Sequence, residues 1–342
     1  MEVPEPEEAE IHASEFPPII DGHLIDRTKI VLPDPIIENL LSITEKLELV
    51  GGSKMFKTWS LIDMALSVAN GVPWWGRQTF KTHVVYLNME LNQPFFEQRL
   101  FEVADAKQVV VPAEFHAIHL RGAKLHDRTR WEKFLKYLDD HLPRFPHPLL
   151  ISDPIYKMLG GKNENSAGDI NAMMDQLEDL VQRTEGANAF GHHQAKGNQS
   201  DKEAIDRSSG SGVFQRDPDT LLPMTTHEND KCFTVSPILR NHPPINDFVL
   251  EWKSPLFTPR HDLDPQSLKQ KPSPGHTKYS VQLLVTLLGQ RSLRTKAFEK
   301  RAREESGMVA STFHVFLRKA EKAKLIAKDL ISEEWQVIKT NP

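Results

Sequence analysis

The chain has 342 residues, with 42 Lys and Arg against 47 Asp and Glu, a net charge of −5 and one cysteine. This length accommodates one large domain and a small one, each with its own core. The single Cys232 excludes an internal disulfide framework and a cysteine-rich metal site. No apolar run reaches the roughly 18 residues of a membrane span, and the acidic N-terminus is unlike a signal peptide. We therefore expect a cytoplasmic protein without a membrane segment.

Residues 1–34 are expected to form an acidic, disordered tail, because six of the first fifteen positions are glutamate and prolines follow. At the other end of the chain the charge is reversed. From His276 onward, 13 Lys and Arg face 7 Asp and Glu, a net of +6, which leaves about −11 on the remainder. A basic terminal module indicates contact with an anionic partner, and a solvated helix face is the alternative.

From Lys46 the pattern alternates between short β-rich runs and amphipathic helical segments. Strands are predicted at 46–51, 83–90, 115–120, 148–154 and 187–194, and helices at 58–70, 94–105, 128–142 and 169–184. Apolar strands that alternate with helices favour an α/β fold, with a mostly parallel sheet covered on both faces.

After Val213 the pattern changes to consecutive strands at 220–226, 233–239 and 247–252, which predict antiparallel strands at the sheet edge. The first domain is thus expected to span 35–253, and the Pro- and Ser-bearing stretch 254–277 to be a linker. In 278–342, helices are predicted at 279–289, 294–305 and 311–323, with strands at 325–328 and 334–338. This order is typical of a winged helix-turn-helix module.

The segment from Leu49 to Thr58 predicts a strand, a glycine-bearing turn and the start of a helix, the layout of a phosphate-binding loop. In such a loop Lys57 reaches the β- and γ-phosphates and the Thr58 hydroxyl ligates Mg²⁺. An ordinary strand–turn–helix corner with an incidental Lys-Thr is the alternative. The candidate nucleotide-binding residues are Gly51, Gly52, Ser53, Lys54, Met55, Phe56, Lys57 and Thr58.

Phe56 departs from the usual loop pattern, because it stands where a second glycine is expected. If that position needs a positive φ, a phenylalanine there is strained by about 1–3 kcal/mol. Lys54 could compensate with an extra positive charge, or the loop could take another path. The substitution places the rate of hydrolysis in question more than nucleotide binding.

Two carboxylates follow predicted strands. Asp153 ends the apolar run 149–153, at the sheet edge where ligands of open α/β sheets bind, so it could hold Mg²⁺. Glu90 ends the strand 83–90 and could polarise the water that attacks the γ-phosphate. The alternatives are a turn-capping aspartate before Pro154 and a surface glutamate.

The strand 187–194 ends in His192, His193 and Gln194, whose polar groups could sense the γ-phosphate. Adjacent strand residues point to opposite faces, so the two histidines are poorly placed to share a metal ion. Beyond them, Arg207 and Arg216 lie in and after a glycine-rich polar loop. An arginine delivered from such a loop to a neighbouring subunit stabilises charge on a transferring phosphoryl group, and an ordinary surface loop is the alternative.

The third helix of the C-terminal module carries basic and hydroxyl side chains suited to phosphate and base-edge contacts. Winged modules also bind proteins, and this alternative remains open. The candidate DNA-contacting residues are Ser311, Thr312, His314, Arg318, Lys319 and Lys322.

The ordered set GGSKMFKTW, YLNME, LLISD, GHHQ and RSSGSGVFQRDPD resembles the RecA-like P-loop ATPases of the plasmid RepA replicative helicase group, AAA-type ATPases of mobile elements, over roughly 35–262. The resemblance implies roles for the matching residues here. Lys57 would bind phosphate, Thr58 and Asp153 (the Walker B aspartate) would hold Mg²⁺, and Glu90 would be the catalytic carboxylate. His193 and Gln194 would match the γ-phosphate sensor, and Arg207, with Arg216 as second choice, the arginine supplied in trans.

The resemblance also implies a function: an ATP- and Mg²⁺-dependent motor that acts on DNA as a replicative helicase of a plasmid, phage or integrated element. Its expected partners are single-stranded DNA in a ring-forming homo-oligomer, of the hexameric kind, and duplex DNA at the winged helix. The chain shows no counterpart of the N-terminal domain of larger replicative helicases, so primase recruitment is not inferred. A nucleotide-gated DNA-binding regulator with little turnover and a KaiC-like signalling ATPase are the alternatives.

Overall fold

The computed structural model describes residues 19–141, 145–162, 166–193, 213–269, 279–329 and 331–338. The chain divides into two compact units, Met1–Lys269 and Gln270–Pro342, and each is described by itself.

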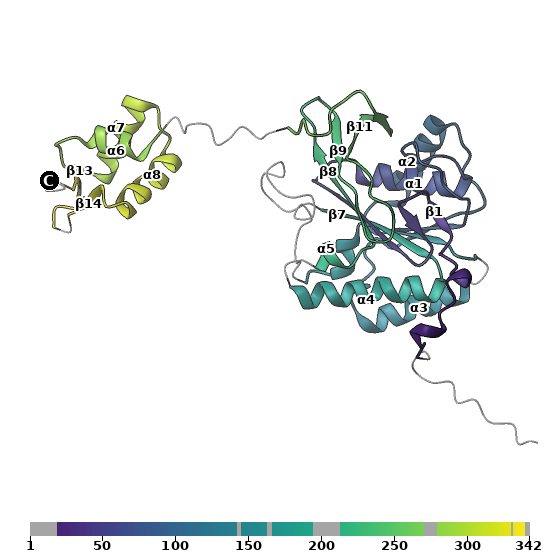
Figure 1. Ribbon diagram of the computed structural model, residues 1–342. Helices are drawn as coiled ribbons and strands as arrows, with labels where there is room; N and C mark the ends of the chain where they lie inside the picture. The colour runs from purple at the N-terminus through teal and green to yellow at the C-terminus, as the bar shows by residue number, and fades with distance from the viewer. Residues whose placement is uncertain are drawn as a thin grey trace, which may run out of the picture. The chain divides into compact units, whose positions relative to one another are not determined.

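A mostly parallel sheet forms the centre of the first unit (Figure 1). Its parallel part has the order β5-β4-β6-β7-β3-β8, so the strand before the glycine turn lies between β7 and β8. These strands are β3 (Lys46–Gly51), β4 (Val84–Asn88), β5 (Phe115–His119), β6 (Leu149–Asp153), β7 (Ala187–His193) and β8 (Thr220–Thr226). The predicted α/β core with a mostly parallel sheet is confirmed.

The sheet continues beyond β8 with three antiparallel strands: β9 (Cys232–Val235), β11 (Phe248–Lys253) and β12 (Leu256–Arg260). A short β10 (Ile238–Leu239) also pairs with β8. The antiparallel extension thus begins at β9, since β8 is parallel to β3. The linker predicted from residue 254 is wrong at its start: β12 pairs along the whole of β11, and residues to Lys269 belong to the first unit.

Helices cover both faces of the sheet (Figure 1). Side chains alternate along β4: Val84 and Tyr86 join the core under α1 and α2, whereas Val85 and Leu87 join the core under α3 and α4. This period-2 alternation, with all five β4 residues buried, is what a sheet between two helix layers requires. The helices are α1 (Lys57–Asn70), α2 (Gln93–Lys107), α3 (Arg128–His141), α4 (Ala167–Thr184) and the short α5 (Val213–Arg216), with a 3-10 turn η3 (Ile155–Leu159) after β6.

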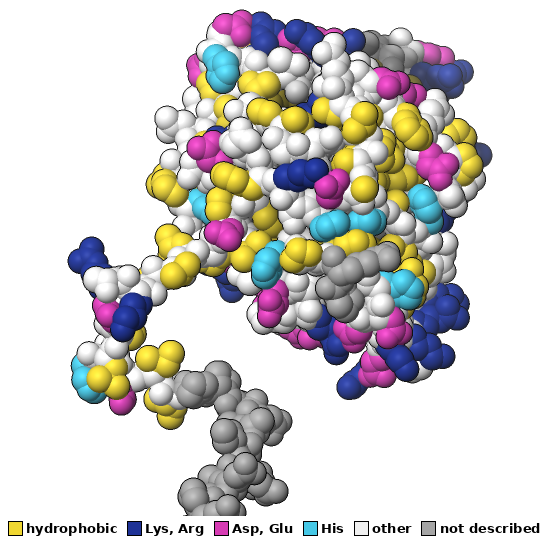
Figure 2. Space-filling model, turned by 90° about the vertical axis from the view of Figure 1, so that its right-hand side faces the viewer, with side chains coloured by type: hydrophobic (Ala, Val, Ile, Leu, Met, Phe, Trp, Pro, Cys, Tyr) yellow, Lys and Arg dark blue, Asp and Glu magenta, His cyan; other side chains and the backbone are white. Residues whose placement is uncertain are grey.

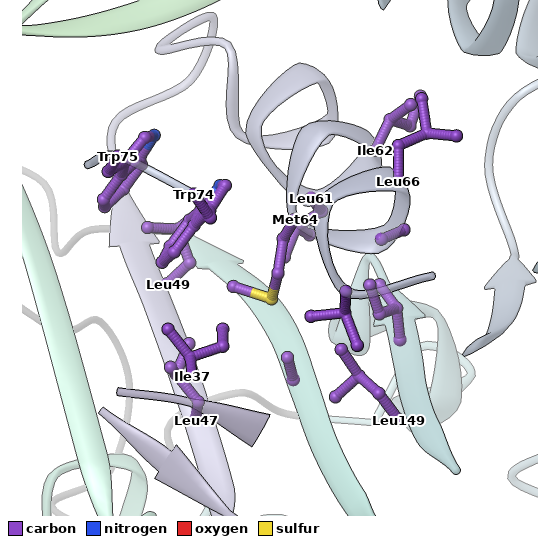
Figure 3. Packing of buried hydrophobic residues seen from close by; sticks show 14 of the residues in the cluster. Ile37, Leu47, Leu49, Leu61, Ile62, Met64, Leu66, Trp74, Trp75 and Leu149 are labelled. Carbon is purple, nitrogen blue, oxygen red and sulfur yellow. The ribbon is translucent and has the colours of Figure 1, made fainter. Parts of the chain in front are cut away.

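The core under α1 holds the loop helix rigidly against the sheet. Leu61 and Met64 of α1 lie over Leu47 and Leu49 of β3, and Trp74 closes one end (Figure 3). Each of these side chains is fully buried. Burial of an apolar side chain of this size contributes about 1.5–3 kcal/mol, so the start of α1 is fixed relative to the end of β3.

A small sheet of β1 (Pro35–Ile37) and β2 (Leu41–Ser42), which the sequence patterns missed, precedes β3. Of the predicted tail, residues 1–18 lie outside the described residues, while 19–34 carry two 3-10 turns, η1 (Gly22–Leu24) and η2 (Arg27–Lys29). This segment stands off the body with its apolar side chains exposed (Figure 2). They are Ile19, Ile20, Leu24, Ile25, Ile30, Val31 and Leu32.

The second unit has three helices and a three-stranded antiparallel sheet of order β13-β15-β14. Its elements are α6 (Val281–Leu288), β13 (Leu293–Arg294), α7 (Thr295–Ser306), α8 (Ala310–Lys322), β14 (Ile326–Lys328) and β15 (Glu334–Val337). A separate core holds them together, centred on Phe298, Phe313 and Trp335. In the part of the chain that the structure describes, no helix is both long and apolar enough to cross a bilayer.

Candidate active site

The segment Gly51–Phe56 joins the end of β3 to the start of α1 as a loop with alternating backbone conformation. Lys54 has φ 65° and Phe56 φ 58°, whereas Ser53 and Met55 are not in the positive-φ region. Alternation between right- and left-handed residues turns successive N–H groups toward one point, which makes an anion-binding concavity. The loop leads directly into the N-terminus of α1, where the helix dipole also favours an anion. This backbone fits a phosphate group.

Phe56 occupies the left-handed conformation that a glycine would adopt freely, as the last residue before α1. Its ring is stacked on Trp252 of β11, with centroids 4.1 Å apart and planes at 6°. Phe233 of β9 and Phe257 of β12 contact it edge-on, each at 6.4 Å. An aromatic pair contributes about 0.5–1.5 kcal/mol beyond area burial, comparable with the roughly 1–2 kcal/mol cost of a left-handed L-residue. The antiparallel strands therefore stabilise the conformation that the missing glycine would otherwise provide.

Lys57 begins α1 and folds back over the loop. Its ammonium donates to the carbonyls of Gly51 and Gly52, at 2.7 and 3.0 Å, and lies 3.4 Å from His193 Nδ1. Burial lowers the pKa of Lys57 to about 8, although the Asp153 and Glu90 carboxylates oppose the shift. The predicted phosphate-binding lysine thus lies beside the predicted sensor residue His193, whose strand position is paired with Gly51.

Thr58 and Asp153, from α1 and β6, are brought together as predicted. The Thr58 hydroxyl hydrogen-bonds the Asp153 carboxylate, and Tyr86 Oη donates to Asp153 Oδ2 at 2.8 Å. Burial raises the pKa of Asp153 against these hydrogen bonds. Sequence reasoning missed Tyr86, because nothing in a strand pattern shows which neighbour an inward tyrosine contacts.

One hydroxyl and one carboxylate fit a Mg²⁺ ion bound mainly by nucleotide. In the described ranges, no three His, Cys, Asp or Glu side chains form a metal-binding group. A cation at Thr58 and Asp153 would take its remaining oxygen ligands from phosphate and water, as Mg²⁺ commonly does.

Glu90 lies two residues beyond the end of β4 and is exposed. Its carboxylate accepts a hydrogen bond from Tyr156 Oη at 3.1 Å, and the Tyr156 ring lies 5.7 Å from that of His193. The charge of Glu90 acts on both Lys57 and Asp153. The predicted catalytic carboxylate therefore lies at the same sheet edge as the loop, with Tyr156 as an orienting partner that the sequence did not reveal.

His192, the other histidine of the predicted pair, belongs to a different environment. Its Nδ1 lies 2.7 Å from Glu48 Oε1, and its ring stacks on Phe214 at 3.7 Å. The pair therefore does not form a shared metal site, in line with the opposite faces of adjacent strand residues.

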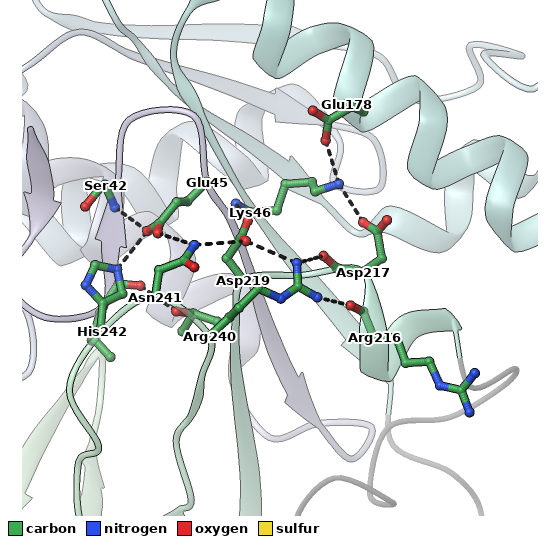
Figure 4. Close-up of polar contacts among 12 residues, drawn as sticks. Ser42, Glu45, Lys46, Glu178, Arg216, Asp217, Asp219, Arg240, Asn241 and His242 are labelled. Atoms are coloured by element: carbon green, nitrogen blue, oxygen red, sulfur yellow. Dashed lines mark hydrogen bonds and ion pairs between the residues drawn. The ribbon is translucent and has the colours of Figure 1, made fainter. Parts of the chain in front are cut away.

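Arg216 lies at the opposite edge of the sheet from the loop. It precedes β8, whose first residue, Thr220, pairs with Leu47 near the start of β3. Arg240 donates to the Arg216 carbonyl and to Asp219, and Asp217 pairs with Lys46 at 2.6 Å (Figure 4). The six residues of β3 span roughly 17 Å at strand rise, so the Arg216 side chain cannot reach the loop of its own chain.

Two predicted site residues lie outside the described residues: Gln194 of the sensor pair and Arg207, the first choice for the trans arginine.

The strand order, the anion-binding loop and the Thr58–Asp153 pair define a RecA-like P-loop ATPase. The chain belongs to the AAA domain family, whose model matches residues 13–199. No curated protein matches the chain. Among the solved structures that match is the ATPase domain of another protein, with 11% identity, a TM-score of 0.46, and coverage of 63% of this chain and 84% of that one. At that TM-score the likeness carries no argument about this protein.

Proposed function

We propose that the protein is an ATP-driven motor that assembles into a ring and acts on DNA, as a RepA-like replicative helicase of a plasmid, phage or integrated element. The observation that carries the proposal is the convergence of Lys57, Thr58, Asp153 and Glu90 at one sheet edge. These groups supply what phosphoryl transfer to water needs: a cation for the phosphates, ligands for Mg²⁺ and a carboxylate for the nucleophile. ATP and Mg²⁺ are the expected cofactors.

Two features of the first unit support assembly. Arg216 is exposed at the edge away from its own loop, so it can act on nucleotide only in a neighbouring subunit. The segment 19–32 exposes seven large apolar side chains, and exposed apolar surface of this kind marks an interaction site. A ring of identical subunits, each supplying an arginine to the next site, accounts for both features.

The second unit supports action on DNA. Its order of helices and antiparallel strands is that of a winged helix, and α8 exposes Arg318, Lys319 and Lys322 on the side away from Phe313 and Leu317. The β14–β15 connection carries Asp329, Glu333 and Glu334, which would repel phosphates. We therefore assign the DNA contact to α8 rather than to this hairpin.

The test is ATP turnover with and without single-stranded DNA at several protein concentrations, for wild type, Lys57→Ala and Glu90→Gln. A DNA-stimulated rate that rises with assembly and is lost in both variants supports the motor. For Glu90→Gln we expect unchanged ATP affinity and a rate about 10²–10⁴-fold lower, the usual contribution of a general base. A wild type that binds no nucleotide contradicts the proposal.

A nucleotide-gated DNA-binding regulator is the second candidate. The observation that favours it is Phe56 in the loop, beside a lysine that already donates to the carbonyls of Gly51 and Gly52. ATP-dependent DNA binding without turnover would identify this function, whereas strand separation coupled to turnover would exclude it.

A further inference from the structure

The support of Phe56 by remote strands concerns how the loop reaches its binding conformation. Two residues of the loop, Lys54 and Phe56, have positive φ, and the second leads directly into α1. An L-residue leaves this region readily unless its surroundings oppose it. If Phe56 left it, the N–H groups of the loop would no longer converge.

The ring contacts of Phe56 depend on its backbone. Its Cα–Cβ direction changes with φ and ψ, so the ring can lie flat on Trp252 only while the backbone stays near the present values. Trp252 is itself immobilised: it is 7% exposed and lies against Phe257 at 5.0 Å and Trp59 at 6.1 Å. The stacking energy is thus available only to one conformation of the loop.

We propose that Trp252 is a positioning residue for nucleotide, which acts through Phe56 and holds the loop in its phosphate-binding conformation. The inference rests on the proposed nucleotide-binding function and extends it: strands β9, β11 and β12 become part of the binding machinery for a nucleoside di- or triphosphate. Trp252 touches no phosphate in this arrangement, and its effect passes through the backbone at position 56.

Glycine at position 56 provides the decisive comparison. Glycine adopts positive φ without a side-chain partner, so a Phe56→Gly loop does not need Trp252. The two substitutions should therefore be strongly coupled in nucleotide affinity, as expected for residues in contact. A tryptophan that only fills space in the core would affect both loops equally.

The experiment is a double-mutant cycle read by ADP affinity and, separately, by urea unfolding, using the full chain. Trp252→Leu keeps an apolar side chain but removes the ring face. In the Phe56 background we expect it to weaken ADP binding roughly tenfold, the scale of the left-handed penalty. In the Phe56→Gly background we expect the same substitution to leave affinity within about twofold, because no ring needs support. Trp252→Phe retains a stacking face and should bind ADP nearly as wild type does.

Trp75→Leu is the matched control. Trp75 contacts Phe257 and Phe248 in the same aromatic region, but it stacks on Trp74 rather than on Phe56. It should lower the urea midpoint as Trp252→Leu does, without the loss of affinity. Equal loss in both loop backgrounds, or equal loss from Trp75→Leu, overturns the inference. Failure of wild type to bind ADP would instead overturn the proposed function.

Discussion

The ring of Phe56 in the phosphate loop lies parallel to that of Trp252 in β11, 4.1 Å away. This contact joins the residue that departs most from the loop pattern to the antiparallel edge of the sheet. The loop therefore keeps a glycine-like backbone, with φ 58° at Phe56, without a glycine. The expected strain is present, and neighbouring aromatic rings offset it.

The pKa of Lys57 predicts how ADP binding depends on pH when EDTA removes divalent cations. Burial lowers this pKa to about 8 in the free protein, and bound phosphate must raise it, because an anion favours the charged amine. Below about pH 8 the lysine is already protonated and affinity is flat. Between the free and bound values, affinity should fall about tenfold per pH unit. Calorimetry from pH 7 to 10 measures this.

Lys57→Arg serves as the control for that titration, because arginine stays charged throughout the range. Its ADP affinity should lack the alkaline fall, whatever its absolute value. A wild-type profile that matches the arginine variant would show that Lys57 does not titrate in this range.

Tyr86→Phe should weaken the metal site while leaving the fold intact. The hydroxyl donates to Asp153 at 2.8 Å, and its loss frees the carboxylate to rotate. Removing such an orienting partner typically costs about 10–100-fold in metal affinity. We therefore expect the Mg²⁺ concentration for half-maximal ATP turnover to rise by about that factor, with metal-free ADP affinity unchanged. An unchanged Mg²⁺ requirement would show that Tyr86 does not orient the carboxylate.

Arg216→Ala should abolish hydrolysis without weakening nucleotide binding, because the arginine serves the neighbouring site. Arginines supplied in this way contribute about 10³–10⁵ to the rate. Mixing Arg216→Ala with Lys57→Ala should restore part of the activity, since some interfaces then combine an intact lysine with an intact arginine. Steady-state turnover of the mixture, against each variant alone, measures this.

The control mixture combines Lys57→Ala with Asp153→Asn. Both substitutions fall on the same side of the interface, so no mixed interface is complete and no activity should return. Full activity of Arg216→Ala alone would move the assignment to Arg207, the first choice from the sequence.

Lys46→Met should destabilise the first unit by about 2 kcal/mol, less than a fully buried pair because the partners are partly exposed. The lysine side chain is 7% exposed and pairs with Asp217 and Glu178, at 2.6 and 2.8 Å. Burial alone would lower the pKa of Lys46, but these two carboxylates raise it overall. Urea unfolding measures the loss, with Lys81→Met as the control: Lys81 pairs with Glu114 at the surface and should cost under about 1 kcal/mol. Equal losses would mean that the Lys46 network adds no stability.

Local patterns were sufficient for most of the architecture. The alternation of apolar strands with amphipathic helices predicted β3 to β7 and their helices within a few residues, because burial on both faces leaves a direct mark on sequence. The strand β12 was missed because Pro255 and Pro259 resemble linker composition, although the strand lies at the sheet edge, where proline is tolerated. The short β1 and β2 were missed because two or three residues carry no periodicity.

The sequence alone determined the chemical groups of the site, since the loop, Thr58, Asp153 and Glu90 each follow a strand or begin a helix in recognisable order. Only the tertiary structure decided their partners: Tyr86 on Asp153, Tyr156 on Glu90 and Trp252 under Phe56. These pairs join residues far apart in the chain. Their contacts depend on the order and register of strands, which long-range packing sets and local sequence does not specify.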